Sequence, residues 1–148
     1  LKDKLLASLV KKCRDLPGYH LFSYINDDRE TKEIGSHDVN QYLKEISGED
    51  FTSKDFRTWA GTVSALNYLL RTSLKDGDNK NSIIINCIKS VAILLKNTVN
   101  ICKKYYIHPK IWEVYNNGKF EKLLIQKLPR NSGLSREETL VLQILKAG

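Results

Sequence analysis

Apolar residues recur at helical spacing along most of this 148-residue chain. The clearest case begins at Thr52, which stands as an N-cap with Asp55 at the third helical position, an acidic form of the capping box. The apolar residues that follow return every three or four positions, which places them on one helix face: Phe56, Trp59, Ala60, Val63, Leu66 and Leu70. This spacing predicts a long amphipathic helix that ends near Ser73.

The same pattern predicts further helices on both sides of this one. We expect helices over roughly residues 2 to 15, from a Ser36 cap to Gly48, from the turn at Asp76–Asn79 to an end at Lys96-Asn97-Thr98, from Thr98 to Tyr105, from Pro109 to Tyr115, from Phe120 to Leu128 and from Ser135 to Lys146. Only residues 19 to 25 favour a short extended segment. The expected fold class is mainly α, an array of about seven or eight helices with little strand.

Composition limits the class of protein. With 41% hydrophobic and 28% charged residues, the chain resembles one ordinary globular domain. It contains no run of about eighteen apolar residues, so we expect no membrane partner. Three cysteines without metal-site spacing are expected to be buried thiols. Because the chain begins at Leu1 and contains no methionine, we expect a processed product or an excised fragment.

Positive charge is concentrated in one segment. Between Asn79 and Arg130 there are ten Lys and Arg residues against two Glu, a local charge of +8 in a chain whose total is +7. Aromatic residues are interleaved with these cations, a pattern that suits a polyanion such as nucleic acid. A lysine-rich surface without a partner is the alternative interpretation.

A few residues could carry phosphodiester chemistry. Arg57 lies just inside the helix that follows Thr52, with Lys54 one turn before it and Gly61 one turn after it. Arginine can form a planar fork to two phosphate oxygens, and Gly61 leaves space where another backbone could come close. Tyr105 and Tyr106 follow two lysines, and a nearby cation stabilises the phenolate form that an attacking tyrosine needs. For a single arginine or tyrosine taken alone, an ordinary surface or core role is the default interpretation.

Two long motifs resemble those of a known family. Residues 48–62, GEDFTSKDFRTWAGT, resemble the signature of type IB DNA topoisomerases of the small bacterial and large-virus kind. Residues 91–109, which include Lys96-Asn97-Thr98 and Tyr105-Tyr106-Ile107-His108-Pro109, resemble the segment that carries the family's nucleophile. The resemblance implies the compact helical array of the catalytic domain that these topoisomerases share with tyrosine recombinases.

The resemblance also implies an activity and its residues. Members of the family cut one DNA strand through a 3'-phosphotyrosyl intermediate and relax supercoils without ATP, metal or another cofactor. By motif, Tyr106 matches the nucleophile and Arg57 the arginine that grips the phosphate. Lys54 stands where tyrosine recombinases have histidine, and Asn97 stands at the histidine position of the wider superfamily; both are expected to contact the phosphate.

The expected partner is duplex DNA, bound by a monomer. The candidate DNA-binding residues are Lys96, Lys103, Lys104 and Lys110. A bacterial source would imply a cytoplasmic protein at the nucleoid, and a viral source would imply the virion or the host-cell site of viral DNA.

The chain departs from the family pattern in two ways. Lys96 stands where the family usually has glycine. A second arginine, and the lysine on a β-hairpin that acts as general acid, belong upstream of the matched region, and neither motif is found in Leu1 to Arg14. We therefore expect residues 1–148 to be the C-terminal part of the catalytic domain, without the N-terminal domain or the hairpin, and inactive or weakly active alone.

Two other interpretations remain. One is a fragment of a tyrosine recombinase, against which Lys54-x-x-Arg57 in place of His-x-x-Arg argues. The other is a non-catalytic basic DNA-binding module in which Tyr106 is only structural.

Overall fold

A computed structural model describes residues 3–72, 79–118, 120–125 and 133–146. The chain divides into two compact units, Leu1–Ser53 (unit 1) and Lys54–Gly148 (unit 2), although its composition resembles that of one domain. The described part of the chain is mainly helical, with a single two-stranded sheet, which confirms the predicted fold class.

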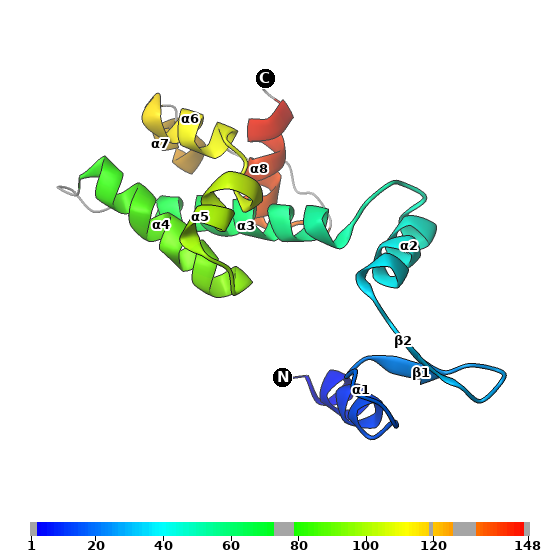
Figure 1. The fold of residues 1–148 in the computed structure, drawn as a ribbon. Helices are drawn as coiled ribbons and strands as arrows, with labels where there is room; N and C mark the ends of the chain where they lie inside the picture. Colours follow the sequence, from blue (N-terminus) through cyan, green and yellow to red (C-terminus); the bar gives the residue numbers. More distant parts are fainter. Residues whose placement is uncertain (1–2, 73–78, 119, 126–132, 147–148) are drawn as a thin grey trace. The chain divides into compact units, whose positions relative to one another are not determined.

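Unit 1 contains two helices and a small hairpin (Figure 1). Helix α1 spans Lys4–Arg14, and the Asp3 carboxylate caps it by accepting hydrogen bonds from two backbone N–H groups of its first turn. Strands β1 (Ser23–Ile25) and β2 (Thr31–Glu33) are antiparallel, with Tyr24 opposite Lys32. The prediction included only the first of these extended segments, because β2 carries no apolar alternation.

Helix α2 (Ser36–Ser47) corrects one predicted cap. The N-cap is Gly35 rather than Ser36, because the Asp38 carboxylate reaches back to accept a hydrogen bond from the Gly35 N–H at 2.8 Å. The helix ends at Gly48, as predicted, and Gly48 takes the left-handed conformation with φ 69°.

Unit 2 begins inside the long helix that the sequence predicted. Helix α3 (Ser53–Thr72) is followed by α4 (Lys80–Leu95), α5 (Val99–Ile101), a π-helical segment η1 (Cys102–Tyr106), α6 (Lys110–Asn116), α7 (Phe120–Ile125) and α8 (Arg136–Lys146). Helix α4 contacts α5 and η1, and α6 packs against α7 and α8 (Figure 1). The predicted turn at residues 76–78 and the predicted end of α7 at residues 126–128 lie outside the described residues.

The core of unit 2 is apolar and draws on α3, α4, α6, α7 and α8 together with η1. Leu66, Leu69, Val91, Ile111 and Leu140 are fully buried. The sequence predicts an apolar face of α4 that includes Cys87, Ile88, Val91, Leu94 and Leu95. All of these are buried except Leu94, which is 59% exposed, and Ile83 at the edge of this face also lies in the core. Periodicity defines a stripe of apolar residues, but the neighbouring helices decide which edge of a wide stripe is covered.

The start of α8 confirms the predicted capping box. The Ser135 N–H donates to the Glu138 carboxylate at 2.7 Å, and the Glu138 N–H donates to the Ser135 hydroxyl at 3.2 Å.

None of the described helices is by itself long and apolar enough to span a membrane. Only α4 taken together with Val99–Tyr106 reaches that length and composition, and this pair is bent by 105°.

Candidate active site

Arg57 on α3 connects two parts of the candidate site in unit 2. Its Nη2 donates a hydrogen bond of 2.7 Å to the carbonyl oxygen of Leu95, and its guanidinium carbon lies 5.1 Å from the centre of the Tyr106 ring. The side chain is partly buried. The guanidinium is thus held between the end of α4 and the predicted nucleophile, at a separation typical of a cation–π contact.

The C-terminus of α4 supplies the carbonyl that holds Arg57. The last carbonyls of a helix have no partner within the helix, so Leu95 O is free to accept from another element. Lys96 adopts the left-handed conformation with φ 50°, and the Asn97 N–H closes the turn by donating to Ala92 O at 2.9 Å. Lysine therefore forms the left-handed turn at the position where the resemblance predicts glycine.

The two tyrosines belong to η1, a π-helical segment where the sequence predicted an ordinary helix. Thr98 caps the preceding α5, as predicted, by accepting from the Ile101 N–H at 3.3 Å. Cys102, the first residue of η1, is fully buried. The wider turn of a π-helix is uncommon and often occurs at functional sites.

The two tyrosine rings lie near different cations. Tyr106 is half-buried against Arg57, whereas Tyr105 is 48% exposed. The ammonium groups of Lys54 and Lys104 lie 5.6 and 5.1 Å from the centre of the Tyr105 ring. Of the four predicted catalytic residues, Arg57 and Tyr106 are brought together, and Lys54 lies beside the neighbouring tyrosine.

Asn97 follows Leu95 by two residues and is partly buried, so its backbone lies next to the carbonyl that binds Arg57. Its own N–H is used in the turn that ends α4. The catalytic role expected for Asn97 stays a prediction, as do those of Lys54, Arg57 and Tyr106.

Gly61 permits the close approach of η1 to α3. A Cβ added at Gly61 would lie less than 3.0 Å from the Tyr106 carbonyl oxygen, a separation that real Cβ atoms do not show. The same Cβ would lie 3.2 Å from a methyl carbon of Leu95. The prediction that Gly61 makes room for another backbone is confirmed, and that backbone is the one of Tyr106.

The candidate DNA-binding lysines differ in their surroundings. Lys96, Lys103 and Lys104 are exposed, whereas the Lys110 ammonium donates to Leu145 O at 3.0 Å and thereby joins α6 to α8. In the described part of the chain, no lysine between residues 79 and 118 forms an ion pair with a carboxylate. The positive charge of this segment is therefore uncompensated by the acids that the structure describes.

The thiols of the core are protected from ionisation. Burial raises the pKa of Cys87 to about 12. Burial also raises the pKa of Cys102, although the nearby Arg57 charge acts in the opposite direction. Cys13 is only partly buried, which corrects the prediction of three buried thiols.

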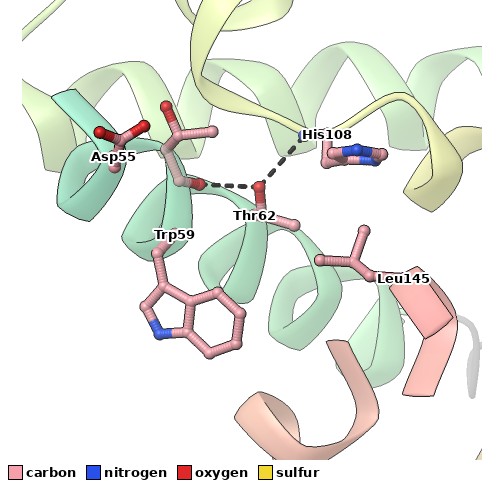
Figure 2. Close-up of a pocket in the computed structure, with 6 residues that line it drawn as sticks. Asp55, Trp59, Thr62, His108 and Leu145 are labelled. Atoms are coloured by element: carbon pink, nitrogen blue, oxygen red, sulfur yellow. Dashed lines mark hydrogen bonds between the residues drawn. The ribbon is translucent and has the colours of Figure 1, made fainter. Parts of the chain in front are cut away.

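A hollow of about 160 Å³ lies beside the tyrosine segment and is lined by Asp55, Thr58, Trp59, Thr62, His108 and Leu145. Figure 2 shows Thr62 between its own helix and the backbone of His108. No group of three or more His, Cys, Asp or Glu side chains in the described ranges could hold a metal ion.

Comparison with known proteins identifies the family. A family model described as "Eukaryotic DNA topoisomerase I, catalytic core" matches residues 2–128. This match covers most of the chain, which therefore belongs to the DNA topoisomerase I family. Among curated proteins, the chain is similar to "DNA topoisomerase 1B" of Acanthamoeba polyphaga mimivirus, with 34% identity over 117 residues. The match covers 74% of this chain and 35% of the viral protein, so the chain spans about a third of that relative's length.

These matches confirm the resemblance to type IB topoisomerases.

The sequence did not indicate that Leu95 would bind Arg57 through its main-chain carbonyl, or that Thr62 would bind the His108 N–H through a buried hydroxyl. No signal of residue type or spacing identifies such partners, because any residue provides a carbonyl and Thr62 lies within an ordinary helical pattern.

Proposed function

We propose that the protein to which this chain belongs breaks and rejoins one strand of duplex DNA, and so relaxes supercoils without ATP or metal. The observation that carries this proposal is the contact between Arg57 and Tyr106 in a chain of the DNA topoisomerase I family. The pairing brings a group that can grip a phosphate to a group that can attack one.

The proposed reaction exchanges one phosphoester for another. The Tyr106 phenol loses its proton and its oxygen bonds to phosphorus, while the bond from phosphorus to the 5'-oxygen breaks and that oxygen takes up a proton. The product is a 3'-phosphotyrosyl link and a free 5'-hydroxyl, and the reverse reaction rejoins the strand. Because one ester replaces another, the protein needs to supply only positioning and charge stabilisation.

Arg57 is suited both to positioning the phosphate and to stabilising its charge. One of its N–H groups is used by Leu95 O, which restrains the guanidinium, and the remaining donors of the group can bind non-bridging phosphate oxygens. Lys54 and Asn97 are proposed to contact the same phosphate. The location of Lys54 beside Tyr105 puts its charge one residue from the nucleophile.

The exposed lysines support DNA as the partner. Lys103 and Lys104 immediately precede the two tyrosines, so a DNA backbone bound by them would pass close to Tyr106. We propose that a single copy of the protein acts on the duplex.

The test uses the full-length protein and supercoiled plasmid in the presence of a metal chelator and without ATP. Stepwise relaxation, together with a protein–DNA adduct on the 3' side of the break, is the expected result. Relaxation without any adduct, or an adduct on the 5' side, would contradict the proposal. Recombination at one defined sequence without general relaxation would favour a tyrosine recombinase instead.

A further inference from the structure

Two residues of α3 fix the backbone on both sides of Ile107. Gly61 lies directly against the carbonyl of Tyr106, with no space for a side chain between them. The Thr62 hydroxyl, which is almost fully buried, accepts a hydrogen bond of 3.1 Å from the His108 N–H (Figure 2). Ile107, between these two anchors, is itself buried in the core of unit 2.

The Thr62 hydroxyl both donates and accepts a hydrogen bond in this arrangement. Its hydrogen is donated to Thr58 O at 2.7 Å, which orients an oxygen lone pair toward the His108 N–H. The Thr58 hydroxyl oxygen in turn lies 3.3 Å from Tyr105 O. The backbone from Tyr105 to His108 therefore rests along one stripe of α3.

The same stripe carries Arg57. Residues 57 and 61 are one turn apart on α3, so the group that grips the phosphate and the surface that supports the nucleophile belong to one rigid helix. Any change in how closely η1 lies against α3 alters the position of the Tyr106 hydroxyl relative to the Arg57 guanidinium.

We propose that Gly61 and Thr62 are positioning residues, which set the distance between Tyr106 and the phosphate held by Arg57. The inference rests on the proposed function. Neither residue touches DNA in this role; each acts through the backbone of the Tyr106 segment.

The first test is Gly61→Ala in the full-length protein. The added Cβ displaces the Tyr106 carbonyl, and a misplacement of about 1 Å can slow a reaction about a hundredfold. We expect that loss in the single-turnover cleavage rate at saturating DNA, with DNA affinity changed less than about twofold. Alanine is a better helix former than glycine, so a slower reaction would not come from a weaker α3.

The second test compares Thr62→Val with Thr62→Ser. Valine keeps the shape but leaves the His108 N–H without its acceptor, and we expect cleavage to slow about tenfold. Serine keeps the hydroxyl and should restore most of the rate. The matched control is Thr72→Val, because Thr72 makes the same hydrogen bond to the carbonyl four residues before it, Tyr68 O at 2.9 Å, at the other end of α3.

The outcomes separate this inference from the proposed function. Normal cleavage by Gly61→Ala and Thr62→Val would overturn the inference alone. A loss in which cleavage, DNA affinity and melting temperature fall together, and which serine does not rescue, would show a purely structural role and also overturn it. Absence of cleavage by the unsubstituted protein would overturn the proposed function and with it this inference.

Discussion

The guanidinium carbon of Arg57 lies 5.1 Å from the centre of the Tyr106 ring, although the two residues are 49 positions apart in the sequence. The contact exists because Leu95 O holds the guanidinium from one side and Gly61 lets the Tyr106 backbone approach from the other.

Tyr106→Phe in the full-length protein should abolish strand cleavage. The substitution keeps the ring beside Arg57 but removes the oxygen that would attack phosphorus, so noncovalent DNA binding should be nearly unchanged. The measurement is the yield of protein–DNA adduct. Tyr105→Phe is the matched control and should do much less. If Tyr105→Phe were inactive and Tyr106→Phe active, the nucleophile would be Tyr105 rather than Tyr106.

Arg57→Ala should slow cleavage by about a hundredfold to a thousandfold, the usual effect of removing a donor aimed at charge that develops in the transition state. Arg57→Lys should restore little, because an ammonium cannot bind Leu95 O and two phosphate oxygens with a planar fork. Asn97→Ala should cost less, since its donor is neutral. Single-turnover rates test the order, and a larger loss in Asn97→Ala would contradict it.

Neutralising Lys103 and Lys104 together should weaken DNA binding to a similar degree on unrelated sequences. Both lysines are exposed and precede the tyrosines, and contacts with the phosphate backbone carry no sequence preference. The slope of log affinity against log salt concentration should fall by about 2. Replacing Lys80 and Lys89 of α4 removes the same charge elsewhere. If that control has an equal effect, the binding surface is not local to the tyrosines.

Lys96→Gly should stabilise the protein. A left-handed conformation costs a residue with a side chain about 1 to 2 kcal/mol, and glycine avoids this cost while losing about 0.5 to 1 kcal/mol through its more flexible unfolded state. The expected net gain is about 0.5 to 1 kcal/mol in urea unfolding. Lys96→Ala removes the charge but keeps the strained φ of 50°, so it should give no gain. An equal gain in both variants would attribute the effect to charge.

Acid should weaken the start of α8. Hydrogen bonds from the backbone and hydroxyl of Ser135, and then from the Trp59 indole, hold the pKa of the Glu138 carboxyl below that of an ordinary glutamate. A carboxyl whose pKa is lower in the folded state stabilises the fold above the pKa of the unfolded chain, and this stabilisation is lost as the pH falls through the folded value. Glu138→Gln should therefore flatten the loss of stability as the pH falls below the pKa of an ordinary glutamate. An unchanged acid profile would count against this role.

The sequence by itself determined the helices, most of their ends and the family. Apolar spacing located α3, α4 and α8, and local capping residues such as Thr98, Ser135 and Gly48 marked ends, because caps depend on side chains within a few positions. Two motifs alone indicate the family and identify Arg57 and Tyr106 as candidate catalytic residues.

Only the tertiary structure decided how those motifs meet. The hydrogen bond from Arg57 to Leu95 O joins residues 38 positions apart, and the one from His108 N–H to Thr62 joins residues 46 apart. The close approach of η1 to α3, and the position of Lys54 beside Tyr105, also depend on tertiary packing. Periodicity is local information, whereas these contacts arise from the packing of distant segments around a common core. The Leu95 carbonyl and the absent Cβ of Gly61 therefore become contact points only because that core brings Arg57 and the Tyr106 backbone to them.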